Sequence, residues 1–133
     1  MVDEIDFEII STPEFTDVSA KIWPEKPLAA ICRDVAQSFY RADPLGRGLY
    51  KLRMAAPGRG KRGGARVIFM YVTRDQRVLL LTAYTKAKQE TLTKQQLERL
   101  SEIGKLLLDE GDWEDGQESF RLSGTRPRTG RGV

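Results

Sequence analysis

Hydrophobic and polar positions near the N-terminus predict a strand followed by a helix. The run Phe7-Glu8-Ile9-Ile10 is β-prone, and Ser11-Thr12-Pro13-Glu14 follows it, where Ser or Thr can cap a helix and Pro suits the first helical turn. The helix should end near Trp23-Pro24, because the residue before a proline disfavours the α conformation. Its apolar face would consist of Phe15, Val18 and Ile22.

A second helix is predicted to begin at Pro27, since apolar residues then recur at spacings of three and four positions. The segment Asp43-Pro44-Leu45-Gly46 would end it. The apolar positions are Leu28, Ile31, Cys32, Val35 and Phe39. Two helices joined by a short linker would form a helical hairpin, and its apolar faces need a sheet to pack against.

Three β-prone runs in the middle of the chain supply that sheet. The last two are joined by the polar turn Arg74-Asp75-Gln76-Arg77, which is typical of antiparallel neighbours. The runs extend from Leu49 to Met54, from Arg66 to Thr73 and from Val78 to Tyr84. We therefore expect an antiparallel meander.

The C-terminal part of the chain predicts one more helix and then a tail. Thr93 and Gln96 have the spacing of a capping box, and the helix should end before Gly111. Its apolar positions are Leu97, Leu100, Ile103 and Leu107. The segment from Asp112 to Val133 has no apolar period, so we expect a mobile charged tail. The predicted fold class is α+β: a domain of residues 1–110, with an N-terminal strand and helix hairpin packed on an antiparallel meander and a C-terminal helix, followed by the tail 111–133.

Composition excludes several kinds of enzyme. The 133 residues contain no histidine, which rules out an imidazole base, a Ser-His-Asp triad and a His-based zinc site, and Cys32 is the one cysteine, so no internal disulfide can form. Cys32 is expected in the core, and no metal or other cofactor is expected. The longest apolar runs, such as Val78–Leu81, are too short to span a bilayer, and the N-terminus does not resemble a signal peptide. The predicted location is the cytoplasm.

Positive charge is concentrated in one segment. Residues 47–77 carry nine Lys or Arg and one Asp, a balance of +8, whereas residues 1–27 carry two basic and seven acidic residues, a balance of −5. The net charge of the whole chain is only +3. A local positive field of this kind attracts anionic partners such as nucleic acid.

The glycine-rich segment Pro57–Gly64 lies inside this basic region. It formally contains G-x-G-x-x-G, but it joins two predicted strands and opens no helix, so we reject a dinucleotide site. One interpretation is a flexible hairpin loop. The other is a basic arm that follows a nucleic-acid backbone through Arg59, Lys61 and Arg62.

Strand alternation predicts a cluster of polar residues on one face of the sheet. Lys51 and Arg53 share a face, and two adjacent cations repel each other unless an anion binds between them. A cation or tyrosine on a strand is more often solvated than functional when taken alone. If the four apolar residues Val67, Phe69, Leu79 and Leu81 pack under the helices, however, an open and exposed face gathers Lys51, Arg53, Arg66 and Tyr84.

These motifs together resemble the RelE/ParE superfamily of toxins, most closely its HigB-type branch. The shared pattern is a K-x-R strand at Lys51 and Arg53, a P-G-x-G-K-x-G-G-x-R-V-I segment from Pro57 to Ile68, and a Y-x-K element at Tyr84 and Lys86, before a capped helix. The resemblance covers about residues 5–108 and implies a RelE-like fold.

The resemblance implies a function as well as a fold. It implies the toxin of a type II toxin–antitoxin pair, a ribosome-dependent endoribonuclease that cleaves messenger RNA in the ribosomal A site by attack of a ribose 2′-OH on the adjacent phosphate. Lys51, Arg53 and Arg66 match the catalytic cations of the family. The RNA-binding residues would be Arg59, Lys61, Arg62, Lys86 and Lys88. The implied partners are the ribosome, messenger RNA and a HigA-like antitoxin with a helix-turn-helix, and no membrane.

One departure concerns the catalytic aromatic residue. The aromatic residue that RelE carries before its last helix aligns near Leu92, which cannot act as a base, and Tyr84 is our replacement. A Lys or Tyr with an ordinary pKa of about 10 would be almost wholly protonated at pH 7 and therefore a poor base, so the acceleration must rest largely on holding the RNA in line for attack.

Two other functions stay open at this point. ParE relatives poison DNA gyrase by binding and cut no RNA, so fold alone does not decide between the two activities. A non-catalytic basic module that binds nucleic acid for regulation is the third hypothesis.

Overall fold

The computed structural model describes residues 4–57, 64–72, 76–86, 91–110 and 118–125, and it has the α+β architecture predicted from the sequence. The elements in chain order are β1 (Glu4–Ser11), α1 (Pro13–Ile22), α2 (Leu28–Ser38), a 3₁₀ turn η1 (Phe39–Arg41), β2 (Asp43–Gly46), β3 (Leu49–Met54), β4 (Ala65–Val72), β5 (Arg77–Thr85), α3 (Lys94–Glu110) and β6 (Glu118–Thr125). Among these described helices none is long and apolar enough to cross a membrane.

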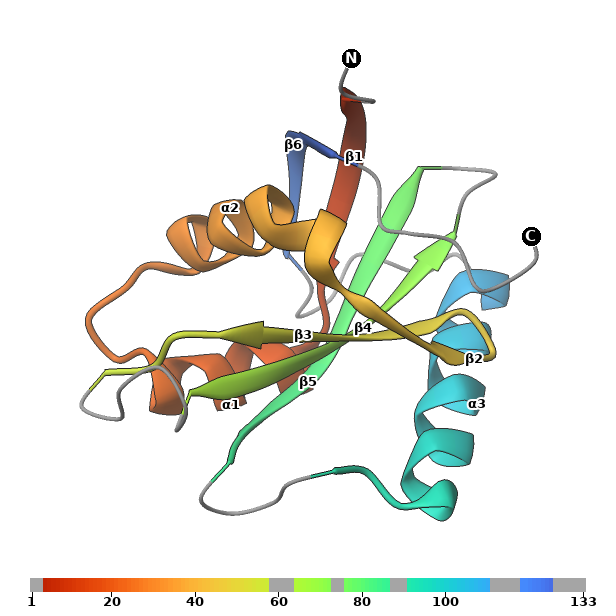
Figure 1. Cartoon of the computed structure of the whole chain (residues 1–133). Helices are drawn as coiled ribbons and strands as arrows, with labels where there is room; N and C mark the ends of the chain where they lie inside the picture. The colour runs from red at the N-terminus through yellow and green to blue at the C-terminus, as the bar shows by residue number, and fades with distance from the viewer. Residues whose placement is uncertain (1–3, 58–63, 73–75, 87–90, 111–117, 126–133) are drawn as a thin grey trace.

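The described strands form one mixed sheet in the order β2-β3-β4-β5-β1-β6 (Figure 1). Strands β3, β4 and β5 are the expected antiparallel meander. Strand β1 runs parallel to β5, which the long crossover through α1, α2 and the meander makes possible. The segment Asp43–Gly46, expected only to end the second helix, forms the edge strand β2.

Local capping signals position α1 and α3 as the sequence predicts. Thr12 Oγ1 accepts a hydrogen bond from Phe15 N at 3.3 Å, and the same hydroxyl donates to Leu80 O at 2.8 Å, which ties the start of α1 to β5. Thr93 and Gln96 make the reciprocal bonds of a capping box, at 2.9 and 3.1 Å. Both helices therefore begin where their caps require.

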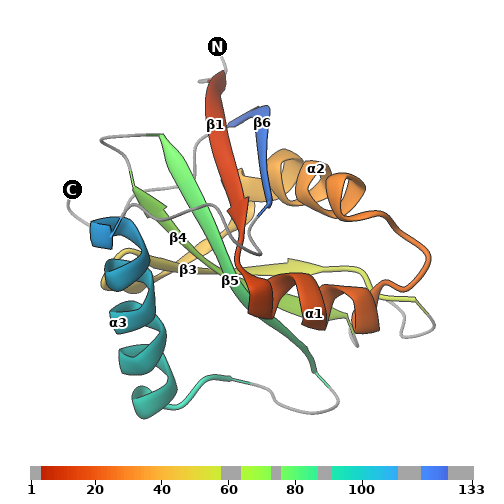
Figure 2. The same cartoon turned by 180° about the vertical axis from the view of Figure 1, so that it is seen from behind.

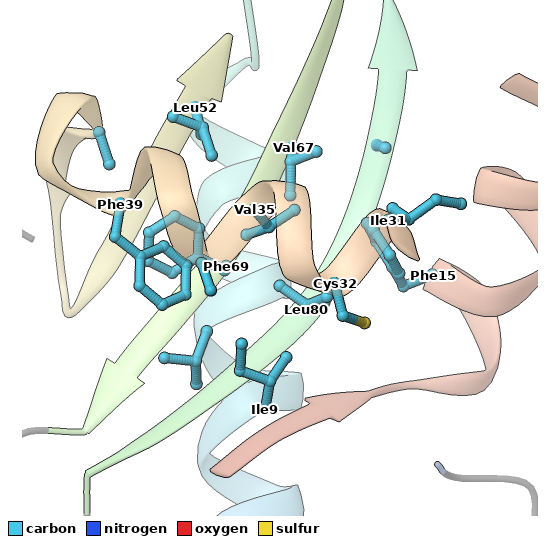
Figure 3. Close-up of a cluster of buried hydrophobic side chains, with 14 of the residues drawn as sticks. Ile9, Phe15, Ile31, Cys32, Val35, Phe39, Leu52, Val67, Phe69 and Leu80 are labelled. Carbon is cyan, nitrogen blue, oxygen red and sulfur yellow. The ribbon is translucent and has the colours of Figure 1, made fainter. Parts of the chain in front are cut away.

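Apolar side chains pack on both faces of the sheet. Helices α1 and α2 cover one face and α3 packs against the other (Figures 1 and 2). Figure 3 shows the first of these cores, where Val35 and Cys32 of α2 lie in one cluster with Val67 of β4 and Leu80 of β5. Cys32 is fully buried, as predicted, and Tyr71 lies in the same core with its ring 5.7 Å from that of Phe7.

A bulge in β5 corrects the predicted sorting of apolar residues between the two faces. The register with β4 shifts between Ile68, which pairs with Thr82, and Phe69, which pairs with Leu80. Strict alternation placed Leu79 and Leu81 under α1 and α2 with Val67 and Phe69. That prediction is wrong, because the extra residue changes the phase of the strand and both leucines pack on the α3 face.

The C-terminal segment is also better ordered than predicted. We expected residues 111–133 to be a mobile tail, but Glu118–Thr125 forms β6 and pairs with all of β1, from Glu4 opposite Thr125 to Ser11 opposite Glu118. Gly124 allows this strand to approach α2, since a Cβ atom there would lie 2.5 Å from the carbonyl oxygen of Ala36. Residues 111–117 and 126–133 lie outside the described residues.

Candidate functional site

The meander brings the predicted catalytic residues together on one face of the sheet. Arg53 of β3 lies directly opposite Arg66 of β4, and Arg66 lies directly opposite Tyr84 of β5. Side chains opposite each other on neighbouring strands have Cβ atoms about 5 Å apart. We call these three residues the Arg53–Arg66–Tyr84 row. Lys51 lies two residues before Arg53 and shares its face.

The Arg53–Arg66–Tyr84 row lies beside helix α3, on the same face of the sheet. The helix packs over the end of the sheet that carries Leu49, Met70 and Leu79, whereas the row lies toward the other end of the same strands. The convergence predicted from strand alternation is therefore present. The face is only partly open, because α3 occupies the rest of it.

Arg66 is the most buried cation of the row, which differs from the exposed position expected of it. It is 6% exposed, while Arg53 is exposed and Lys51 is half-buried. Its Nη1 donates one long hydrogen bond, 3.5 Å, to the carbonyl oxygen of Gly64. Within the described part of the chain, none of the ion pairs includes Lys51, Arg53 or Arg66.

Two arginines opposite each other on neighbouring strands, one of them buried, are costly unless an anion binds them. Like charges directly opposite each other on a sheet destabilise it, and a buried charge without a partner pays a desolvation penalty. A phosphate group would offset both terms at once, since an arginine can donate two parallel hydrogen bonds to it. An oxyanion is therefore the kind of ligand whose charge and geometry would suit this row.

The Tyr84 hydroxyl is buried and has no hydrogen-bond partner among the described residues. Burial raises the pKa of Tyr84 above its ordinary value of 10.0, and the nearby positive charge of Arg66 acts in the opposite direction. The phenol is therefore neutral at pH 7. A neutral phenol beside a bound oxyanion can serve as a hydrogen-bond donor, and burial makes its deprotonated, basic form scarcer at pH 7 than that of a free tyrosine.

A pocket of about 290 Å³ lies next to the row, between β5 and α3. Its lining includes Thr82 and Tyr84 from β5, Leu92, Gln96 and Arg99 from the α3 side, and Glu14 from α1. Leu92, near which we expected the aromatic residue of the family to align, packs on the α3-face core, and Tyr84 is the aromatic residue among those that line this pocket. Sequence reasoning missed the three polar residues from helices, because helix periodicity identifies the apolar face and is silent on which polar side chains meet a distant strand.

The predicted RNA-binding residues are only partly placed. Arg59, Lys61, Arg62 and Lys88 lie outside the described residues. Lys86 is half-buried at the end of β5, and its backbone N–H donates to Gly64 O at 3.1 Å. That carbonyl also accepts from Arg66, so it joins the ends of β4 and β5 beside the row.

A comparison with known families identifies one that matches this chain. A family model described as "RelE toxin of RelE / RelB toxin-antitoxin system" matches residues 16–114. The match includes the whole meander, with Lys51, Arg53, Arg66 and Tyr84, and covers more than half of the chain.

Proposed function

This chain belongs to the RelE toxin family, and on that premise we propose that it is the toxin of a type II toxin–antitoxin pair and cleaves messenger RNA in the ribosomal A site. The observation that carries the proposal is the pair of opposed arginines, Arg53 and Arg66, beside a buried tyrosine hydroxyl. A phosphodiester is the anion that such a row would meet on RNA.

The proposed reaction is an internal transesterification. The ribose 2′-oxygen attacks the adjacent phosphorus, the new O2′–P bond forms and the P–O5′ bond breaks, which gives a 2′,3′-cyclic phosphate and a free 5′-hydroxyl. The 2′-OH proton passes to a base and the departing O5′ takes up a proton. Lys51 lies on the same face of the sheet as Arg53, and its side chain is our candidate for the proton donor to O5′.

The remaining residues would stabilise the charge that develops on phosphorus. Arg53 and Arg66 bind the two non-bridging oxygens, and the neutral Tyr84 hydroxyl donates a further hydrogen bond. One well-placed donor of this kind contributes about 3 kcal/mol to a transition state. Because the pKa of Tyr84 is raised, we do not assign it as the base, and the ribosome would supply the in-line alignment of the substrate.

The partner of this toxin would be an antitoxin, and the HigB-type motifs favour a HigA-like protein with a helix-turn-helix. Two routes to inhibition exist. An acidic segment could cover Lys51, Arg53 and Arg66, or a bulky domain bound elsewhere could block entry to the A site. We favour the second route, because HigB-type relatives are often inhibited away from the catalytic residues. Both routes operate in the cytoplasm, where ribosomes are.

The proposal is tested by inducing the protein in growing cells and mapping messenger RNA ends by primer extension. Wild type should give cleavages within codons of translated messages, and Arg53→Ala should give none. Arg47→Ala is the matched control, because Arg47 belongs to the same basic segment but pairs with Glu98 at 3.6 Å, on the α3 side. DNA double-strand breaks without RNA cleavage would establish the gyrase-poisoning alternative, and growth without either lesion would leave simple binding as the function.

A further inference from the structure

The first turns of α1 and α3 both lie beside the C-terminal end of β5 (Figure 2). Strand β1 pairs with β5 only as far as Ser11, which lies opposite Leu80. Thr12 then caps the start of α1, and its hydroxyl donates to the Leu80 carbonyl oxygen at 2.8 Å. Glu14, in the first turn of α1, therefore comes beside the last residues of β5, where it lines the pocket of about 290 Å³ between β5 and α3.

Helix α3 supplies the opposite wall of this pocket. The α3 residues that line it follow spacings of three and four, which places them on one side of the helix: Gln96, Arg99, Leu100 and Ile103. Leu100 is buried in the α3-face core, and the Gln96 side chain accepts a hydrogen bond from Thr93 N at 2.9 Å, so this side of the helix is held in place. Arg99 is exposed, so its guanidinium group is accessible to a ligand.

This pocket and the Arg53–Arg66–Tyr84 row lie on the same face of the sheet. Tyr84 belongs to both, since it lies opposite Arg66 and also lines the pocket. Thr82 lines the pocket too, and it lies opposite Ile68, which packs in the α3-face core. Opposite side chains on neighbouring strands have Cβ atoms about 5 Å apart, so the pocket begins one strand away from Arg66. An RNA phosphate bound to Arg66 would therefore have its neighbouring nucleotide beside the pocket.

The pocket carries opposite charges on its two helical walls. Glu14 and Arg99 are both exposed, and neither takes part in an ion pair within the residues that the structure describes. A carboxylate only accepts hydrogen bonds and a guanidinium group only donates them. Several other lining residues are apolar, namely Ala83, Leu92, Leu100 and Ile103. The carboxylate repels a second phosphate, whereas a nucleobase is neutral and flat and carries both N–H donors and acceptors on its edge.

We propose that this pocket binds a nucleobase next to the scissile phosphate of the RNA substrate, and that Glu14 and Arg99 determine which base is cleaved fastest at that position. The proposal rests on the proposed function, which places the phosphate on the row. Glu14 accepts a hydrogen bond from a base N–H, and Arg99 donates to a ring nitrogen or carbonyl oxygen. Unstacked bases of single-stranded RNA are commonly read through their edges in this way. An apolar antitoxin side chain is the less suitable occupant, because it brings no donor for Glu14 and no acceptor for Arg99.

The first test measures binding without ribosomes and without a substrate phosphate. The full chain is titrated with adenosine, guanosine, cytidine and uridine, and with ribose as the base-free control, while backbone amide shifts are followed by NMR. At least one nucleoside should shift the amides of Arg99 and Leu100, and ribose should not. Glu14→Ala and Arg99→Ala should each weaken that binding about tenfold, as expected for one hydrogen bond to a charged group. Asp17→Ala and Lys105→Ala, at exposed positions of α1 and α3 outside the lining, are the matched controls and should bind like wild type.

Two results of this titration would overturn the proposal. One is the absence of any nucleoside-dependent shift at Arg99 and Leu100. The other is a shift of the Arg99 amide with inorganic phosphate and none with nucleosides, which would make the pocket a second phosphate site.

The second test measures base preference during cleavage on programmed ribosomes, with each of the four bases placed in turn on either side of the cut. Glu14→Ala and Arg99→Ala should reduce the ratio between the fastest and slowest cleavage rates about tenfold, and Asp17→Ala and Lys105→Ala should keep the wild-type ratio. If wild type cleaves RNA and the first two variants keep its ratio, the pocket proposal is wrong and the proposed function stands.

The remaining outcomes separate the pocket from the proposed function and from the antitoxin. If wild type cleaves no RNA but binds nucleosides more tightly than Glu14→Ala does, the proposed function fails and the base site stands. If Arg99→Ala loses affinity for the cognate antitoxin while keeping the wild-type base preference, the pocket belongs to the antitoxin and the proposal is overturned.

Discussion

Replacing Tyr84 with phenylalanine removes one oxygen atom and leaves the ring in place. That oxygen is buried and lacks a hydrogen-bond partner among the described residues. Folding therefore removes its hydrogen bonds to water and replaces them with none. An unsatisfied buried hydroxyl costs about 1–3 kcal/mol. Taking the lower end, because Tyr84 itself is only half-buried, we expect Tyr84→Phe to raise the free energy of unfolding by about 1 kcal/mol.

The same change should reduce catalysis. If the hydroxyl donates to the phosphate only when RNA is bound, its removal costs the transition state about 3 kcal/mol, or roughly a hundredfold in rate. Urea unfolding gives the stability difference, and a thermal melt should show an increase of about 3 °C for a chain of this length. Cleavage of a programmed ribosomal complex under single-turnover conditions gives the rate.

A variant that is more stable but cleaves more slowly indicates that the removed hydroxyl serves function at the expense of stability. A destabilised Tyr84→Phe protein would show that the hydroxyl is paired in the folded state, and the assignment of an orphaned donor would then be wrong. A stabilised Tyr84→Phe protein with full activity would support the unpaired state of the hydroxyl and refute its catalytic role. Tyr71→Ala is the control for ring packing: it should destabilise by a few kcal/mol, because it removes an aromatic side chain from the α1 and α2 core.

Four further outcomes follow from the structure. Arg66→Met should abolish cleavage while raising stability by about 1 kcal/mol in urea unfolding, since a buried charge without a carboxylate partner is exchanged for an apolar group of similar length; lower stability would mean that Arg66 is paired in the folded protein. Gly124→Ala should cost about 1–3 kcal/mol because its Cβ would meet the Ala36 backbone, whereas Gly104→Ala meets only the flexible end of Met70 and should cost less; equal costs would contradict the close packing of β6 on α2. Burial raises the pKa of Tyr50 and Tyr84, so these groups leave the wild-type free energy of unfolding independent of pH below pH 10.0 and lower it as pH rises from 10.0 through the raised folded values; the stability advantage of Tyr84→Phe over wild type should therefore grow above pH 10.0, and a constant difference would exclude a raised pKa. Steric exclusion predicts that the Lys51→Ala/Arg66→Ala double variant binds antitoxin like wild type in calorimetry, and a loss of more than about tenfold, 1.4 kcal/mol, would place the antitoxin on the cations.

The parts of the fold that depend on neighbouring residues were predictable. The Thr12 cap and the Thr93–Gln96 capping box act within one helical turn, and the structure contains both. The shared face of Arg53 and Arg66 was also accessible, because alternation along two adjacent strands sorts their faces without knowledge of the rest of the sheet, whereas their direct opposition depends on the strand register. Family motifs then supplied the chemistry, which composition and periodicity alone do not contain.

The errors have a common cause in contacts between distant segments. The β5 bulge that moves Leu79 and Leu81 to the α3 face depends on how β5 pairs with β4, and no local pattern marks it. The strand at Glu118–Thr125 has weak β propensity and forms because β1 and α2 are there to receive it. The burial of Arg66 likewise results from the packing of the whole sheet and could not be read from its charged neighbours.

The pairing of β1 with β6 has a consequence for synthesis of the protein. Glu4 pairs with Thr125, so β1 is synthesised well before the strand that pairs with it. Until residue 125 has been translated, β1 presents one free edge, and an unpaired strand edge is a template for aggregation. A message that is broken or truncated before this point would yield a chain in which β1 stays an edge strand, so β1 becomes an internal strand of the sheet only when the transcript is intact through codon 125.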